Sequence, residues 1–206
     1  MTAAESRYQK LRSHLHYLRL EAAAEALPGE LERARKGKLS HTAFLERLLE
    51  IEVEATEARR LAGRLRFASL PAPWTLADFD FDAQPALDRK LVDELATLRF
   101  VEEQANLLLV GPPGVGKTML AVCLARQAVE AGYRVYYTSA ADLAARCHRA
   151  ALEGRWATAM RFYCGPALLV IDLRRPRDYA DTRSAVIADR LLGAAFLIGS
   201  PAGVSA

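Results

Sequence analysis

A glycine-rich run between an apolar segment and a helical segment constrains the fold of this chain more than any other feature. Residues 111–118 read Gly-Pro-Pro-Gly-Val-Gly-Lys-Thr and match the pattern GxxxxGK[ST]. Residues 106–110 before this run are apolar and short, and residues 117–130 carry apolar side chains at helical spacing. The sequence therefore predicts a strand, a glycine loop and the N-terminus of a helix in direct succession.

The chemistry of a phosphate cradle accounts for the residue types in this loop. Glycines let the backbone turn with its N–H groups pointing inward, toward phosphate oxygens. A helix that begins at Lys117 adds a positive dipole and unpaired N–H groups. The Lys117 ammonium can reach the β- and γ-phosphates, and the Thr118 hydroxyl can ligate Mg²⁺. The alternative is a glycine turn that binds nothing. We assign nucleotide binding to Gly111, Pro112, Pro113, Gly114, Val115, Gly116, Lys117 and Thr118.

Asp172 is the candidate magnesium ligand outside the loop. It directly follows the apolar run Ala-Leu-Leu-Val-Ile at residues 167–171. The carboxyl ends of parallel strands meet at the sheet edge where ligands bind, so this carboxylate is expected near the glycine loop. There it can hold Mg²⁺, often through water. The alternative is an ordinary helix cap or loop aspartate, and the phosphate loop upstream favours the metal role.

The chain after residue 105 alternates between strand and helix patterns. Apolar or β-branched runs at residues 106–110, 133–139 and 167–171 are separated by helical patterns at 117–130 and 140–154. Such strands pair in parallel and are covered on both faces. We predict an α/β fold, the three-layer core of a P-loop NTPase, with three parallel strands. After Asp172 we expect one short helix at about 182–192 and a mobile end at 199–206.

The residues before the core have the pattern of a small all-α module. Pro28 is predicted to end a first helix, and Ser40 is a plausible N-cap for a long helix that ends near residue 66. Pro71 and Pro73 cannot continue that helix. A lead-in helix is expected at 85–99. The predicted divisions are a helical N-terminal module (1–70), a linker and lead-in helix (71–105), a P-loop ATP-binding core (106–172) and a divergent C-terminal tail (173–206).

Composition and charge exclude several classes of protein. The 206 residues are 51% hydrophobic and 26% charged, which is typical of a soluble globular chain and not of a disordered one. Lys+Arg exceed Asp+Glu by 28 to 25, too small a margin to identify a polyanion-binding protein. The three cysteines form no CxxC pair, which argues against a disulfide framework or a zinc site. With no secretory signal and no apolar run of membrane-spanning length, we expect a cytoplasmic protein without membrane contact.

Two stretches of the core carry a resemblance to a known family. Residues 106–118 (Asn-Leu-Leu-Leu-Val-Gly-Pro-Pro-Gly-Val-Gly-Lys-Thr) and 132–143 (Gly-Tyr-Arg-Val-Tyr-Tyr-Thr-Ser-Ala-Ala-Asp-Leu) resemble the IstB family. Residues 79–106 are similar to that family's lead-in to the phosphate loop. The likeness covers residues 8–172. The family consists of AAA+ ATPases that assist insertion-sequence transposases and are relatives of the DnaC-like helicase loaders.

The resemblance implies cofactors and partners that the residue patterns alone do not. It implies ATP and Mg²⁺ as cofactors, duplex DNA and a transposase as partners, and assembly into a homo-oligomer. A DnaC-like helicase loader is an alternative with nearly the same nucleotide motifs. A non-hydrolysing, ATP-dependent protein that binds DNA or a partner is an alternative from another class. A small-molecule P-loop kinase would need an arginine-bearing lid, for which residues 174–177 are poor support.

Position 173 departs from the family's pattern. Family members carry an acidic residue, usually Glu, directly after the Walker B aspartate to orient the attacking water. Here that position is Leu173, which cannot act as a base. Beyond it, neither the polar sensor 1 residue nor the arginine finger has a counterpart. We predict an AAA+-like core left incomplete at the C-terminus by a frameshift or truncation, with uncovered strand edges. ATP binding is expected to survive better than hydrolysis, and no catalytic residue is assigned.

Three further sets of residues have open roles. Two basic clusters could contact DNA phosphates or form a solvated helix surface. Phe79 and Phe81 could line the adenine side of the nucleotide site or anchor the linker. Cys123 is expected to be a small buried side chain. The basic clusters consist of Arg33, Arg35, Lys36, Lys38, Arg59, Arg60, Arg64 and Arg66.

Overall fold

The computed structural model of this chain describes residues 3–85, 87–173 and 194–199, and it divides into two compact units. The first unit is Met1–Ala62 and the second is Gly63–Ala206, so the division falls inside one long helix, α3 (His41–Ala68). The domain limits expected from the sequence stay a prediction. Among the helices of the described ranges, none has both the length and the apolar character that a membrane span needs.

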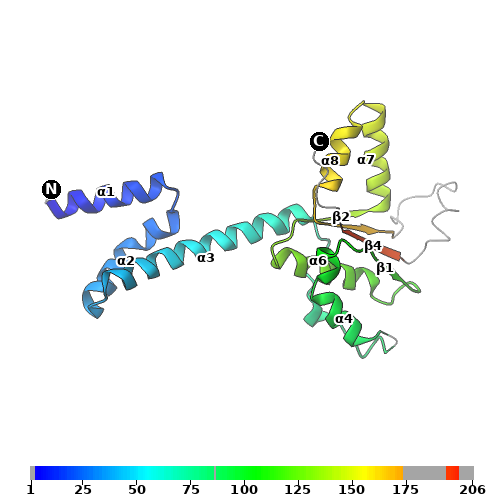
Figure 1. Ribbon diagram of the computed structural model, residues 1–206, viewed down its shortest axis with the longest axis horizontal. Coiled ribbons are helices and arrows are strands. Elements are labelled where there is room, and N and C mark those ends of the chain that lie inside the picture. Colours follow the sequence, from blue (N-terminus) through cyan, green and yellow to red (C-terminus); the bar gives the residue numbers. More distant parts are fainter. Residues whose placement is uncertain (1–2, 86, 174–193, 200–206) are drawn as a thin grey trace. The chain divides into compact units, whose positions relative to one another are not determined.

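Helices make up the described part of the first unit: α1 (Ala3–Tyr17), α2 (Glu21–Gly37) and the part of α3 up to residue 62 (Figure 1). Leu15, Leu27 and Leu48 are buried together, one from each helix. Burial of a side chain of this size contributes about 1.5–3 kcal/mol. α3 begins where the sequence predicted, because the Ser40 hydroxyl oxygen accepts a hydrogen bond from the Ala43 N–H at 3.2 Å.

Pro28 does not separate two helices, and that prediction was wrong. α2 continues through Pro28, and the chain turns earlier, at Arg19, whose φ of 60° is left-handed. A proline inside a helix removes a backbone hydrogen bond and costs about 3 kcal/mol. Ala24 and Leu27 on the same helix are fully buried while Pro28 is exposed. Packing of the buried face therefore outweighs the local preference of the proline.

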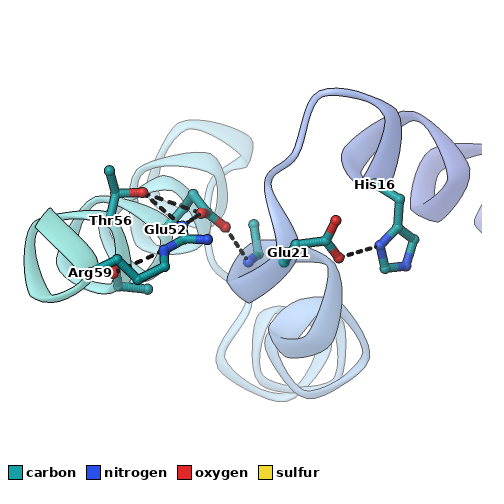
Figure 2. Close-up of polar contacts among 7 residues, drawn as sticks. His16, Glu21, Glu52, Thr56 and Arg59 are labelled. Carbon is teal, nitrogen blue, oxygen red and sulfur yellow. Dashed lines mark hydrogen bonds and ion pairs between the residues drawn. The ribbon is translucent and has the colours of Figure 1, made fainter. Parts of the chain in front are cut away.

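A carboxylate on α3 caps the N-terminus of α2. Glu52 is buried, and its Oε2 accepts a hydrogen bond from the Ala23 N–H at 2.9 Å (Figure 2). The first N–H groups of a helix have no partner within the helix, and no side chain at the α2 N-cap supplies one. Arg59 donates to Glu52 Oε1 at 2.6 Å, and Thr56 donates to the same oxygen at 3.4 Å. Glu52 thus holds α2 against α3.

Figure 2 also shows a surface contact at the start of α2. His16 Nδ1 and Glu21 Oε2 lie 2.6 Å apart, which joins the end of α1 to the first residue of α2. Both side chains are largely exposed, so this pair contributes less than the buried Glu52 contact.

Glu52→Gln is expected to lower the stability of the first unit and to remove part of its pH dependence. Burial acts to raise the pKa of Glu52, but the hydrogen bonds from Ala23 and Arg59 outweigh it and hold the pKa below the ordinary value of 4.5. The stabilisation is therefore complete above that ordinary value and is lost as the pH falls through the lower folded pKa. We expect a loss of about 1.5–3 kcal/mol at neutral pH.

Urea denaturation at several pH values, with hydrogen exchange of the α2 amides, checks this. Glu50→Gln is the matched control, because Glu50 lies on the exposed face of the same helix, paired with Arg47. It should change stability by less than about 0.5 kcal/mol. Equal effects of the two variants would contradict the capping role.

The second unit contains a four-stranded sheet with the order β1-β4-β3-β2. β2 and β3 are parallel, and β4 is antiparallel to both β1 and β3. α6 contacts all four strands, and most of its side chains are buried. The elements after α3 are η1 (Leu76–Asp78), α4 (Arg89–Ala96), α5 (Arg99–Glu102), β1 (Leu107–Val110), α6 (Lys117–Glu130), β2 (Val135–Ser139), α7 (Ala140–Leu152), α8 (Trp156–Cys164), β3 (Leu168–Asp172) and β4 (Ala194–Gly199).

We predicted a sheet of three parallel strands with uncovered edges, and this was wrong because a fourth, antiparallel strand lies within the sheet. β1, β2 and β3 run in the same direction, as expected, but β4 lies between β1 and β3. The edges of strands expose unpaired N–H and C=O groups. The apolar run 194–199 pairs with two such edges, one of β1 and one of β3. The expected helix at 182–192, and all of 199–206 except its first residue, lie outside the described residues.

The lead-in to the core is fastened to α6 through backbone carbonyls. Cys123 donates to the Thr75 carbonyl at 3.1 Å, Arg126 to that of Pro73 at 2.9 Å, and Gln127 to that of Ala96 at 2.8 Å. The single helix predicted at 85–99 was wrong, because α4 and α5 are separated at Leu98. This buried residue adopts a left-handed φ of 63°, and the chain turns there.

Cys123 is expected to resist alkylation in the folded protein. The residue is buried, as the sequence predicted, and burial together with the nearby Asp78 carboxylate raises the pKa of its thiol to about 11. Since the thiolate is the reactive form, labelling at neutral pH should be far slower at Cys123 than at the exposed Cys164. Timed iodoacetamide labelling with peptide mass spectrometry measures this. Equal labelling rates of Cys123 and Cys164 in the native protein, with neither rate changed by urea, would contradict this expectation.

Candidate phosphate-binding site

The glycine loop lies between the carboxyl end of β1 and the N-terminus of α6, as the sequence predicted. Gly114 and Gly116 adopt left-handed φ values of 88° and 85°, which other residues rarely tolerate. Gly116 is also the N-cap of α6, and as a glycine it supplies no side-chain cap to this helix end. The first N–H groups of α6 are thus available to an anion, and the helix dipole favours one there.

The Phe79 ring packs against the glycine loop at Gly116. A Cβ atom on Gly116 would lie 3.0 Å from the Phe79 ring, so the ring and the loop backbone are in close contact. Phe79 is buried and packs edge-on against Phe81 at 5.0 Å between ring centroids, and the Arg89 guanidinium lies 5.0 Å from the Phe81 centroid. These contacts favour the role of linker anchor for both phenylalanines. The alternative role at an adenine stays a prediction.

Lys117 and Thr118 occupy the first turn of α6. The Lys117 ammonium folds back over the loop and donates to the Pro112 carbonyl at 2.6 Å. Both side chains are half-buried, whereas Pro112, Pro113 and Gly114 are exposed. The loop therefore combines one cation, one hydroxyl and the start of a helix, a donor set that fits phosphate oxygens and the Mg²⁺ that accompanies them.

Asp172 lies at the same sheet edge as the loop. Through the strand pairs, Leu109, Ala195, Asp172 and Ser139 form one row across β1, β4, β3 and β2. The loop begins two residues after Leu109, so the sheet brings Asp172 to the edge from which the loop starts. Asp172 is only 3% exposed, and Leu173, which follows it, is half-buried.

Tyr137 contacts the candidate site, and sequence reasoning missed it. Its hydroxyl donates a hydrogen bond of 2.6 Å to Asp172 Oδ2. Side chains two residues apart on a strand share a face, so Tyr137 lies on the same face of β2 as Ser139, which pairs with Asp172. That signal could be used only once the register of β2 against β3 was known. The hydrogen bond orients the carboxylate, a typical outer contact of a metal ligand.

The basic clusters are largely engaged in contacts within their own units. Arg33 and Lys36 pair with acidic residues on α2, and Arg59 and Arg60 pair with acidic residues on α3. Arg64 donates to the Val129 carbonyl at 3.1 Å. These contacts favour the structural interpretation for these five side chains. Contact with DNA stays a prediction.

Gly116→Ala is expected to destabilise the second unit by about 1–2 kcal/mol, the cost of a left-handed conformation in a residue with a side chain. The new Cβ would also press on the Phe79 ring. Gly63→Ala is the matched control, because Gly63 lies in α3 of the same unit with open space around it. It should be neutral or stabilising by up to about 1 kcal/mol. Thermal unfolding compares the two, and a neutral Gly116→Ala would contradict the strained loop.

Comparison with known proteins agrees with the resemblance seen in the motifs. Residues 13–194 match the family model described as IstB-like ATP binding protein. The chain is 36% identical over 164 residues to the ATP-binding protein of insertion sequence IS5376 from Geobacillus stearothermophilus, covering 80% of this chain and 65% of the relative. It is 39% identical over 158 residues to that of insertion sequence IS21 from Pseudomonas aeruginosa, covering 77% and 60%.

A third relative aligns over more of the chain. An insertion-sequence ATP-binding protein of Mycobacterium tuberculosis is 32% identical over 186 residues, covering 88% of this chain and 74% of the relative. By contrast, the chain spans less than two thirds of the length of the relatives from Geobacillus stearothermophilus and Pseudomonas aeruginosa.

Proposed function

Since the chain belongs to the family of IstB-like ATP-binding proteins, we propose that it binds ATP with Mg²⁺ and acts as the helper of an insertion-sequence transposase on DNA. One observation carries the nucleotide part of this proposal. The glycine loop has Gly114 and Gly116 in left-handed conformations and leads directly into the N-terminus of α6, which has no side-chain cap. This helix end lies at the sheet edge that also holds Asp172.

Each residue of the site has a distinct role in binding. The loop backbone and the first turn of α6 would hold phosphate oxygens, and Lys117 would exchange its contact with the Pro112 carbonyl for them. Thr118 and Asp172 would hold Mg²⁺, with Asp172 oriented by Tyr137. When bound, Mg²⁺ would neutralise charge on the phosphates.

We further propose that hydrolysis is impaired. Leu173 stands where the family carries the acidic residue that orients the attacking water, and an aliphatic side chain cannot take a proton. Binding rests on the loop, Lys117 and Thr118, none of which this change touches. The same observation favours the second candidate function, in which ATP binding supports contact with DNA or a partner without turnover. Assembly into a homo-oligomer belongs to the proposal as an expectation from the family.

Lys117→Ala is the direct test. We expect ATP·Mg²⁺ binding, measured by calorimetry, to weaken by tenfold or more, about 1.4 kcal/mol, because the variant lacks the cation that pairs with the phosphates. Lys90→Ala is the matched control, since Lys90 is an exposed lysine on α4 and not part of the glycine loop. It should bind as the wild type does.

Phosphate release in the same samples, with and without duplex DNA, tests the second part. We expect no turnover above that of Lys117→Ala in either condition. Turnover that disappears in Lys117→Ala would show that another group replaces the missing carboxylate, and the proposed impairment would be wrong. Absence of ATP binding to the wild type would overturn the proposed function itself.

A further inference from the structure

The hairpin of α7 and α8 carries a cavity that the nucleotide site does not use. The two helices lie side by side (Figure 1) and are joined by a turn at Gly154, whose φ of 67° is left-handed. A cavity of about 330 Å³ opens between them, and it shares no residue with the glycine loop or with Asp172.

The floor and the rim of this cavity differ in chemistry. The apolar part of the lining, called the floor below, consists of Ala150, Ala159, Phe162 and Tyr163. Three arginines line it as well. Arg155 is paired with Glu153, while Arg149 is exposed on α7. The third is Arg146. The lining is therefore apolar at its base and carries a net positive charge.

The Tyr163 hydroxyl lies beside Arg146 in the wall of this cavity. Tyr163 is 93% removed from solvent, and its hydroxyl oxygen has no hydrogen-bond partner of good geometry among the described residues. Arg146 donates to the Tyr136 hydroxyl at 3.2 Å and also interacts with the Tyr163 hydroxyl. Burial raises the pKa of Tyr163, so the hydroxyl keeps its proton at neutral pH. Arg146 is therefore held beside the cavity by the two tyrosines.

Large apolar side chains extend the surface at the turn of the hairpin. Leu152, at the end of α7, is 75% exposed, and Trp156, at the start of α8, is 50% exposed. Exposed aromatic side chains next to arginines are typical of protein-binding surfaces.

We propose that this cavity docks an acidic peptide segment of a partner protein, with one apolar side chain of the peptide on the floor and flanking carboxylates on Arg146 and Arg149. The volume suits a single phenylalanine or leucine side chain, and carboxylates form charge-assisted bonds with guanidinium groups. A nucleic acid backbone needs an open row of cations, whereas this site has an apolar base and one arginine already paired with Glu153. The inference does not depend on the proposed nucleotide function.

The test uses the full chain and fluorescence anisotropy of a labelled synthetic peptide with one phenylalanine flanked by glutamates. A peptide with glutamines in place of the glutamates and a labelled DNA duplex are the comparison probes. Arg149→Glu is expected to weaken binding of the acidic peptide by about tenfold or more, because it reverses a rim charge. Ala159→Phe, which fills the floor, should weaken it to a similar extent.

Arg161→Glu is the matched control, since Arg161 is an exposed arginine on α8 that does not line the cavity. It should leave peptide binding unchanged, and all three variants should show the circular dichroism spectrum and the thermal unfolding of the wild type, which shows that they fold. Weaker binding of the acidic peptide to Arg149→Glu, with unchanged binding to Arg161→Glu, supports the proposed site. The inference is overturned if the acidic peptide does not bind, if both arginine variants weaken it equally, or if only the duplex binds in a manner that depends on Arg149.

Discussion

Burial of α6 against the sheet is the contact on which the rest of the second unit depends. Val122, Leu124 and Ala125 are completely removed from water. Such burial contributes about 1.5–3 kcal/mol for each large side chain. The same helix is tied to the lead-in segment through the carbonyls of Thr75, Pro73 and Ala96. Because the glycine loop is the direct N-terminal continuation of α6, its position follows from that packing.

The second constraint is the register of the sheet. β4 joins β1 to β3, and its pairing with both strands places Asp172 in one row with Leu109, just before the loop. A strand from the C-terminal segment thus completes a sheet that would otherwise expose the backbone groups of β1 and β3. The same register brings the Tyr137 hydroxyl to Asp172. The proposed metal-binding part of the site is therefore a product of strand pairing, and the proposed phosphate-binding part is a product of local conformation.

This difference explains how much of the site could be predicted. The conformations of Gly114 and Gly116, the start of α6 at Lys117 and the burial of Cys123 follow from residue type and local order along the chain. Pro28 was misjudged because the buried face of α2 outweighs a local preference. The break between α4 and α5 was missed because a buried leucine, Leu98, adopts a conformation that its residue type disfavours.

The sequence by itself determined the glycine loop, the strand before it, the helix after it and the family to which the chain belongs. These features rest on glycine conformations, helix dipoles and apolar runs, all of which act over a few neighbouring residues. Only the tertiary structure decided the place of β4, the partner of Asp172, the contact of Phe79 with Gly116 and the cavity between α7 and α8. The first three join residues far apart in the chain, whereas the cavity joins two successive helices. The pairing and packing that bring these residues together leave no periodic signal in the sequence.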